Sequence, residues 1–202
     1  MGTVKSLLLG MCFVLGACTS QTSTVQTTEK GTQWEWQNGT IVVKTPERPA
    51  GQKSVLGLTT PKLEAVRVGF VGLGMRGPGA VERFTYIPGT QVVALCDYEE
   101  ARADKCQELL KKASMPKAAV YSGDKGYEEL CKRDDIDLVY VAADWLHHFP
   151  VAKCALENGK NVAIEVPSAM NLQECWDLIN LSESTRKHCF ILENCCYDWF
   201  EM

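Results

Sequence analysis

Short apolar runs alternate with amphipathic stretches along the chain from Val66 onward. The runs are Val66–Gly72, Gln91–Asp97, Ala118–Tyr121, Asp137–Ala142, Asn161–Glu165 and Cys189–Glu193. Near-continuous Val, Ile, Leu and Ala in these runs predicts strands that are buried on both faces of a sheet. Because the stretches between them have helical periodicity, the pattern indicates an α/β fold with a parallel, doubly wound sheet.

The helical stretches carry signals of their own. The apolar face of the second stretch is expected to consist of Ala101, Cys106, Leu109 and Leu110. Two lysines follow this face, where the C-terminal end of a helix dipole favours cations. Further along, Asn158-Gly159 predicts the end of a helix directly before the run that starts at Asn161.

The N-terminal segment has the pattern of an export signal. Lys5 precedes the apolar run Leu7–Leu15, and the segment closes with Leu15-Gly16-Ala17-Cys18. This closing sequence resembles the lipobox of bacterial lipoproteins, in which the signal is cleaved before a cysteine that is then lipidated. The resemblance implies a signal peptide over 1–17 and an exported lipoprotein, anchored by Cys18 to the cell membrane or outer membrane. Met1-Gly2 with Ser6 also fits N-myristoylation, but that pattern predicts no apolar run ending in cysteine.

Residues 18–62 are expected to form the lipidated cysteine, a polar tether and an N-terminal arm. The tether is rich in Thr, Ser and Gln, a composition typical of flexible linkers. Trp34, Trp36 and Ile41-Val42-Val43 predict a partly ordered arm that packs on another surface. Prolines then interrupt the chain before the predicted domain at 63–202.

Composition narrows the functional classes. With 202 residues, 46% of them hydrophobic, the chain can form one domain with a core. A net charge of −4 without a clustered basic face argues against a nucleic-acid partner. The ten cysteines include no C-x-x-C pair and no histidine at metal-ligand spacing, so we expect small buried side chains and no metal site. Disulfides are compatible with export, but their connectivity cannot be deduced from sequence.

The first strand leads into a glycine loop. Gly72-Leu73-Gly74-Met75-Arg76-Gly77 matches G-x-G-x-x-G between a predicted strand and a predicted helix, the context that gives this pattern its meaning. Gly72 permits the tight turn, Gly74 lets a pyrophosphate approach the backbone, and Gly77 lets the helix pack closely on the strand. The loop therefore predicts a dinucleotide whose pyrophosphate binds at the helix N-terminus.

Asp97 ends the second predicted strand, 20 residues past Gly77. This is the position of the acid that binds the adenosine ribose hydroxyls in dinucleotide-binding domains. Tyr98, Glu99 and Glu100 follow it, so the sequence places no base next to it that would accept a 2′-phosphate. We therefore expect NAD rather than NADP, with a role as helix N-cap as the alternative for Asp97.

Two later strand ends also carry candidate ligands, because dinucleotides bind outside the carboxyl ends of parallel strands. One ends in Asp144-Trp145-Leu146-His147-His148 and the other in Glu165-Val166-Pro167. One of the paired histidines is expected to be a packing or capping residue, and a metal site is not expected without further ligands.

Together these motifs resemble the Gfo/Idh/MocA oxidoreductase family from Val66 onward. Its hallmarks are the glycine loop, then H-x11-G-K before a strand, then E-K-P. Here they read His148…Gly159-Lys160, with ten residues between His148 and Gly159, and Glu165-Val166-Pro167. Val166 replaces the lysine that helps orient or catalyse in most members, which argues against an ordinary sugar dehydrogenase.

With Val166 at this position, the sequence resembles one branch of the family, the glycoside hydrolase family 109 α-N-acetylgalactosaminidases. The resemblance rests on Gly74-Met75-Arg76-Gly77-Pro78-Gly79, Asp97-Tyr98, Trp145-Leu146-His147-His148, Glu165-Val166-Pro167-Ser168 and Glu193-Asn194-Cys195-Cys196-Tyr197. It implies that NAD contacts Met75, Arg76, Asp97, Trp145, Leu146, His147, His148, Glu165, Val166 and Asn194. It also implies removal of terminal α-linked N-acetylgalactosamine from glycans by oxidation, elimination, addition and reduction, with recycled NAD.

Family members are longer, and the resemblance implies that a C-terminal α/β substrate domain is missing here. That domain carries the acid/base residues, so no catalytic residue is assigned within 1–202. Two alternatives stay open: an NAD-dependent sugar dehydrogenase of the Gfo/Idh/MocA family, and an inactive NAD-binding lipoprotein fragment.

Overall fold

The structure, a computed structural model, describes residues 26–27, 33–193, 195–197 and 199–200. The expected signal peptide, Cys18 and Asn194 lie outside the described residues. The chain divides into two compact units, 1–44 and 45–202, each of which is described by itself.

The first unit contains a small antiparallel sheet of β1 (Gln26–Thr27), β2 (Gln33–Gln37) and β3 (Thr40–Val43). Asn38 and Gly39 connect β2 to β3 with φ angles of 51° and 78°, the backbone of a type I′ hairpin turn. The predicted partly ordered arm is thus a β-hairpin in this region. The Asn-Gly pair between two β-rich runs is the signal that identifies it.

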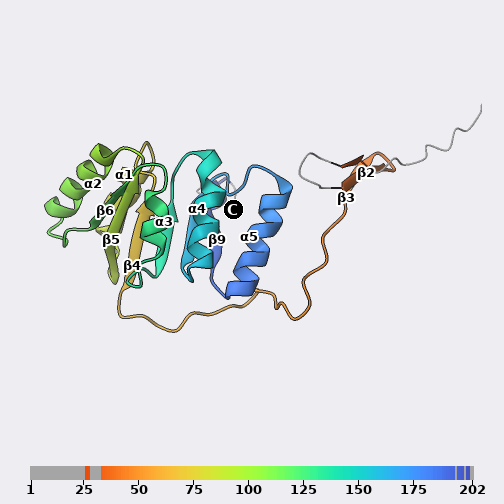
Figure 1. Ribbon diagram of the computed structural model, residues 1–202, viewed down its shortest axis with the longest axis horizontal. Helices are drawn as coiled ribbons and strands as arrows, with labels where there is room; N and C mark the ends of the chain where they lie inside the picture. The colour runs from red at the N-terminus through yellow and green to blue at the C-terminus, as the bar shows by residue number, and fades with distance from the viewer. Residues whose placement is uncertain (1–25, 28–32, 194, 198, 201–202) are drawn as a thin grey trace, which may run out of the picture. The chain divides into compact units, whose positions relative to one another are not determined.

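The second unit is built on six parallel strands. They are β4 (Val66–Val71), β5 (Thr90–Asp97), β6 (Ala119–Ser122), β7 (Leu138–Val141), β8 (Asn161–Glu165) and β9 (Cys189–Leu192). Their order in the sheet is β6-β5-β4-β7-β8-β9, so the direction of winding reverses between β4 and β7 (Figure 1). The predicted parallel, doubly wound sheet is confirmed, and each apolar run forms one strand.

Helices cover both faces of this sheet (Figure 1). They are α1 (Gly77–Phe84), α2 (Glu100–Lys112), α3 (Gly126–Cys131), α4 (Trp145–Glu157) and α5 (Leu172–Thr185), followed by the 3-10 turn η1 (Cys195–Tyr197). Apolar residues of α1 and α2 pack with Phe70 and Leu95 on one face, and those of α3, α4 and α5 pack with Val71 and Ile164 on the other. None of the helices in the described part of the chain is long and apolar enough to cross a bilayer.

The buried face of α2 differs from the expected one in that Ala103 takes the place of Ala101, and Leu109 is half-buried. Ala103, Cys106 and Leu110 are buried, whereas Ala101 is exposed. Five residues separate Ala101 from Cys106, which places them about 140° apart around a helix of 3.6 residues per turn. The predicted end of α4 is confirmed, since the helix stops at Glu157 and Gly159 follows with a φ of 73°.

The cysteines of the described residues differ in their exposure. Cys96, Cys106 and Cys131 are buried as expected, whereas Cys175, Cys195 and Cys196 are exposed. No group of metal-binding side chains large enough to hold an ion occurs among the described residues.

The segment before β4 is bound to α5. Arg48 donates two hydrogen bonds of 2.8 and 2.9 Å to Glu183, which is only 3% exposed, and Gln52 donates to the same carboxylate. Arg186 donates to the carbonyl oxygens of Lys53 and Ser54. Residues 45–54 are therefore held on the C-terminal end of α5.

Candidate dinucleotide site

A cleft of about 1190 Å³ lies at the carboxyl ends of the strands. Its lining includes most of the sequence-predicted cofactor residues: Gly72, Gly74, Met75, Arg76, Asp97, Trp145, Leu146, His147, His148, Glu165 and Val166. Gly77 lies beneath this surface. Met75, Trp145 and Leu146 are 94%, 62% and 73% exposed, an apolar rim that a ligand can cover.

The three glycines of the loop have the separate roles that their spacing predicts. A Cβ on Gly72, whose φ is 91°, would lie 2.3 Å from the backbone nitrogen of Ala143. A Cβ on Gly77 would lie 2.1 Å from the carbonyl oxygen of Gly72, so only glycine permits this approach of α1 to β4. A Cβ on Gly74 would have a guanidinium nitrogen of Arg102 as its nearest neighbour, at 3.5 Å. The loop thus leaves space for a ligand where a pyrophosphate would approach.

The N-terminus of α1 is suited to an anion. Its N-cap residue, Arg76, makes no side-chain capping bond, and no acidic residue lies in the first helical turn. The first N–H groups of a helix have no partner within the helix, and its dipole favours negative charge there. The backbone therefore fits the pyrophosphate of a dinucleotide.

Asp97 joins the glycine loop to the end of β5. Its Oδ2 accepts a 2.6 Å hydrogen bond from the Leu73 N–H, and its Oδ1 accepts a 2.9 Å bond from the Glu99 N–H. The side chain is only 5% exposed but lines the cleft. Glu99, not Asp97, is the N-cap residue of α2, so the alternative role as helix N-cap is not observed.

A base does lie beside Asp97. Arg102 Nη1 is 3.5 Å from Asp97 Oδ1, and Arg102 Nη2 is 2.8 Å from Glu99 Oε1. The expectation that no base neighbours Asp97 was wrong, because the first turn of α2 brings a residue five positions later back to the strand end. A basic residue in that turn is the signal to look for, and the basis for choosing NAD over NADP is correspondingly weaker.

Asp144 and His147 form a pair at the start of α4. Asp144 caps the helix by accepting from the Leu146 N–H at 3.0 Å, and its Oδ2 lies 2.6 Å from His147 Nδ1. Burial has the largest single effect and would raise the pKa of Asp144, but the interactions with His147 and the backbone hydrogen bonds together hold that pKa below its usual value. His147 is thereby oriented along the cleft wall.

His148 is buried, at 1% exposure, and directs both ring nitrogens to the backbone. Nδ1 lies 2.7 Å from the Pro167 carbonyl oxygen and Nε2 lies 2.9 Å from that of Ala143. The ring links the chain after β7 to the chain after β8. This is the packing role expected for one of the two histidines, and it leaves no ring nitrogen for a ligand.

Glu165 is held by a residue that sequence reasoning missed. Tyr140, in β7, donates a 2.8 Å hydrogen bond to Glu165 Oε1. Burial, together with the Glu165 carboxylate, raises the pKa of Tyr140 to about 12, so the phenol remains a donor. In the sequence Tyr140 is simply another apolar member of a buried strand, and only the pairing of β7 with β8 brings it to Glu165.

A doubly wound parallel sheet with this loop and this strand-end acid defines a dinucleotide-binding Rossmann domain. The family description "Oxidoreductase family, NAD-binding Rossmann fold" matches residues 66–192. The chain belongs to this family, Gfo/Idh/MocA.

Individual relatives refine the comparison. The whole chain is 80% identical to glycosyl hydrolase family 109 protein 4 of Phocaeicola vulgatus, but spans only 39% of that protein. This identity confirms the resemblance to glycoside hydrolase family 109. Myo-inositol dehydrogenase from Lactobacillus casei, solved with NAD(H) and myo-inositol, is 25% identical with a TM-score of 0.59, over 67% of this chain and 38% of that one. Biliverdin reductase from Synechocystis, solved with NADP+, is 26% identical with a TM-score of 0.54, over 62% and 37%.

Proposed function

We propose that the chain is the cofactor-binding part of a family 109 glycoside hydrolase that removes terminal α-linked N-acetylgalactosamine and uses NAD. The observation that carries the proposal is the single cleft in which the glycine loop, Asp97 and Glu165 meet at the switch point of the sheet. The 80% identity to a protein named for family 109 supports the hydrolase class.

The residues of the chain would hold the cofactor in an extended position across the strand ends. The N–H groups of the loop and of α1 would bind the pyrophosphate, and Asp97 would accept hydrogen bonds from the adenosine ribose. Bound NAD would supply a hydride acceptor that is restored in each cycle. Val166 cannot transfer a proton, so acid/base groups are assigned to the part of the relatives that this chain does not span.

Titration calorimetry on the 202-residue chain in mild detergent tests the cofactor proposal, with heat of binding expected for NAD+ or NADH. Absence of heat with both, in folded material, would refute it. The reaction is tested with a chromogenic α-N-acetylgalactosaminide and a full-length family 109 relative carrying this chain's cleft residues. Release of the chromophore without net NADH supports the hydrolase, whereas net NADH from free sugar supports the dehydrogenase, which the similarity to an inositol dehydrogenase favours.

We also propose export and lipid anchoring through Cys18 to the cell membrane or outer membrane, on the sequence pattern alone. Incorporation of labelled palmitate in a bacterial host that processes lipoproteins is the test. A Cys18→Ser variant should lose the label, and a Cys12→Ser variant should retain it.

A further inference from the structure

The Tyr140–Glu165 pair lies in the half of the cleft beyond the switch point. The glycine loop follows β4 and Asp97 follows β5, so the adenosine half of a bound dinucleotide belongs on that side. A dinucleotide that crosses the switch point directs its nicotinamide toward β7 and β8. Glu165, the last residue of β8, lines the cleft there.

Tyr140 has the properties of a positioning residue. It pairs with Ala163 across β7 and β8, so its side chain and that of Glu165 lie on the same face of the sheet. Its ring stacks on Phe70 at 5.0 Å and meets Phe84 edge-on at 5.8 Å. With the ring fixed on two sides and 6% exposed, the hydroxyl holds the Glu165 carboxylate in one position.

This half of the cleft has an acidic character. The lining residues at or directly after the ends of β7 and β8 include the acidic Asp144 and Glu165 beside the apolar Ala142, Ala143 and Val166. Two arginines, Arg76 and Arg102, are among the described residues that line the cleft. They belong to the glycine loop and to α2, which lie on the side of β4 and β5. Arg83 interacts with the Tyr140 phenol but does not line the cleft, and His147 is paired with Asp144.

We propose that Tyr140 positions Glu165 so that the cleft binds oxidised NAD+ more tightly than NADH. The inference rests on the proposed function, since it requires a nicotinamide dinucleotide in this cleft. The nicotinamide ring of NAD+ carries a positive charge that NADH lacks, so a fixed carboxylate attracts only the oxidised form. For an assumed separation of about 8 Å between the two charges, and an effective dielectric between about 20 and 80, the attraction corresponds to about a two- to thirtyfold preference.

The test compares the dissociation constants of NAD+ and NADH. NADH is titrated by its fluorescence and NAD+ by competition, on the full chain in mild detergent. Glu165→Gln removes the charge. Tyr140→Phe keeps the charge and removes the phenol's hydrogen bond to Glu165 together with its interaction with Arg83, and a double variant combines the two changes. Tyr121→Phe is the matched control, since it also removes a tyrosine hydroxyl from a side-chain hydrogen bond, here one accepted from Arg133 Nη1, and Tyr121 does not line the cleft.

The preference for NAD+ should fall at least twofold in Glu165→Gln, fall less in Tyr140→Phe, and stay unchanged in Tyr121→Phe. In the double variant, the loss of Tyr140 should add nothing to the loss of Glu165, a result that a merely structural role for Tyr140 would not produce. If both forms bind but Glu165→Gln leaves their ratio unchanged, the inference is overturned and the proposed function stands. If neither form binds to the folded wild-type chain, both are overturned.

Discussion

Replacement of the loop glycines by alanine tests how the cleft is built. In Gly77→Ala the new Cβ would lie 2.1 Å from the carbonyl oxygen of Gly72, whereas real Cβ contacts are almost never closer than 3.0 Å. Backbone must therefore move by about 1 Å, a distortion that costs about 1–3 kcal/mol in well-packed proteins. The same movement displaces the N–H groups at the start of α1, so NAD binding should weaken at least tenfold.

Two other glycines in the same region serve as matched controls. In Gly79→Ala the new Cβ would lie 3.5 Å from Arg83 Nη1, an ordinary contact within α1, so the variant should gain about 0.5–1 kcal/mol from helix propensity. In Gly74→Ala the nearest atom is also 3.5 Å away. Its stability should change by less than about 0.5 kcal/mol, but the methyl group should occupy the space needed for the pyrophosphate and weaken NAD binding.

Equilibrium unfolding in urea, followed by circular dichroism, measures the three stabilities, and calorimetry measures NAD binding. Gly77→Ala should lower the free energy of unfolding, and Gly79→Ala should raise it. If Gly77→Ala were as stable as Gly79→Ala, the close approach of α1 to β4 would not exist as described. If Gly74→Ala bound NAD normally, the pyrophosphate would lie elsewhere.

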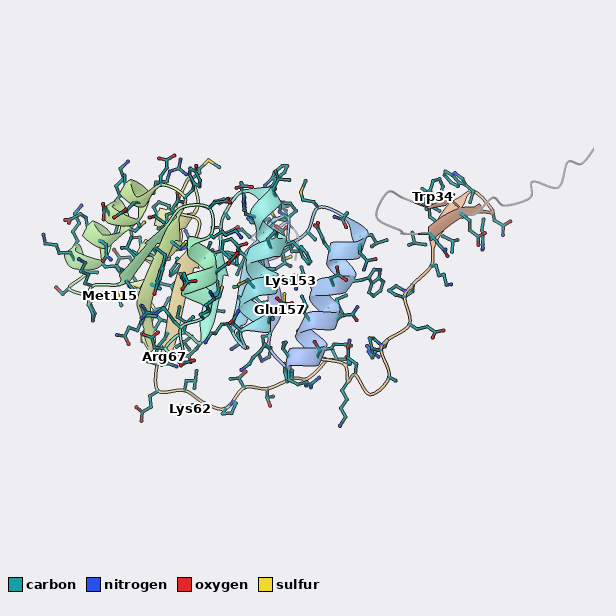
Figure 2. All side chains as sticks on the ribbon, viewed as in Figure 1. Trp34, Lys62, Arg67, Met115, Lys153 and Glu157 are labelled. Carbon is teal, nitrogen blue, oxygen red and sulfur yellow. The ribbon has the colours of Figure 1, made fainter. Side chains whose placement is uncertain are left out.

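Arg102→Gln should weaken NADP+ binding at least threefold relative to NAD+, because it removes the cation beside the ribose acid; an unchanged ratio in calorimetry would argue against this. Arg67 donates to Asp137 at 2.7 and 2.9 Å at the amino-terminal edge of the sheet (Figure 2) and lowers the pKa of that carboxyl. Because a lowered folded-state pKa adds stability above about pH 4 that is lost as pH falls, Arg67→Met should destabilise at pH 7 and much less at pH 3 in urea unfolding. Iodoacetamide at pH 8 should label exposed Cys175 and spare Cys96, whose pKa burial and then Asp97 raise to about 12; mass spectrometry reads the sites, and equal labelling would contradict the described burial.

The sequence was sufficient where a feature depends on residues that are close along the chain. The apolar runs located all six strands, and the spacing of Gly72, Gly74 and Gly77 identified the loop, because strand burial and turn geometry act over a few residues. The pairing of Tyr140 with Glu165 was not predicted, since it depends on the lateral register of two strands 25 residues apart. The periodicity of apolar residues predicts which face of a strand is buried, but it does not predict which polar side chains of two strands form a hydrogen bond.

The position of Arg102 beside Asp97 was not predicted for a different reason. Its distance from Asp97 is short in sequence, but the relevant neighbour of a strand end is the residue one helical turn later rather than the next residue. Inspection of the linear sequence alone gave Tyr98, Glu99 and Glu100 as neighbours and missed the guanidinium. The hairpin at Asn38-Gly39 was likewise visible in principle, because that dipeptide is a strong short-range hairpin signal.

The attachment of residues 45–54 to the end of α5 determines from which side the domain is held. Helix α5 runs antiparallel to the strands, so Glu183 and Arg186 lie at the amino-terminal edge of the sheet, the edge opposite the cleft. A pull on the N-terminal part of the chain would therefore act on the base of the domain and be transmitted first to the Arg48–Glu183 ion pair. Within the unit 45–202, such a load would thus enter the domain at the end opposite the strand ends that line the cleft.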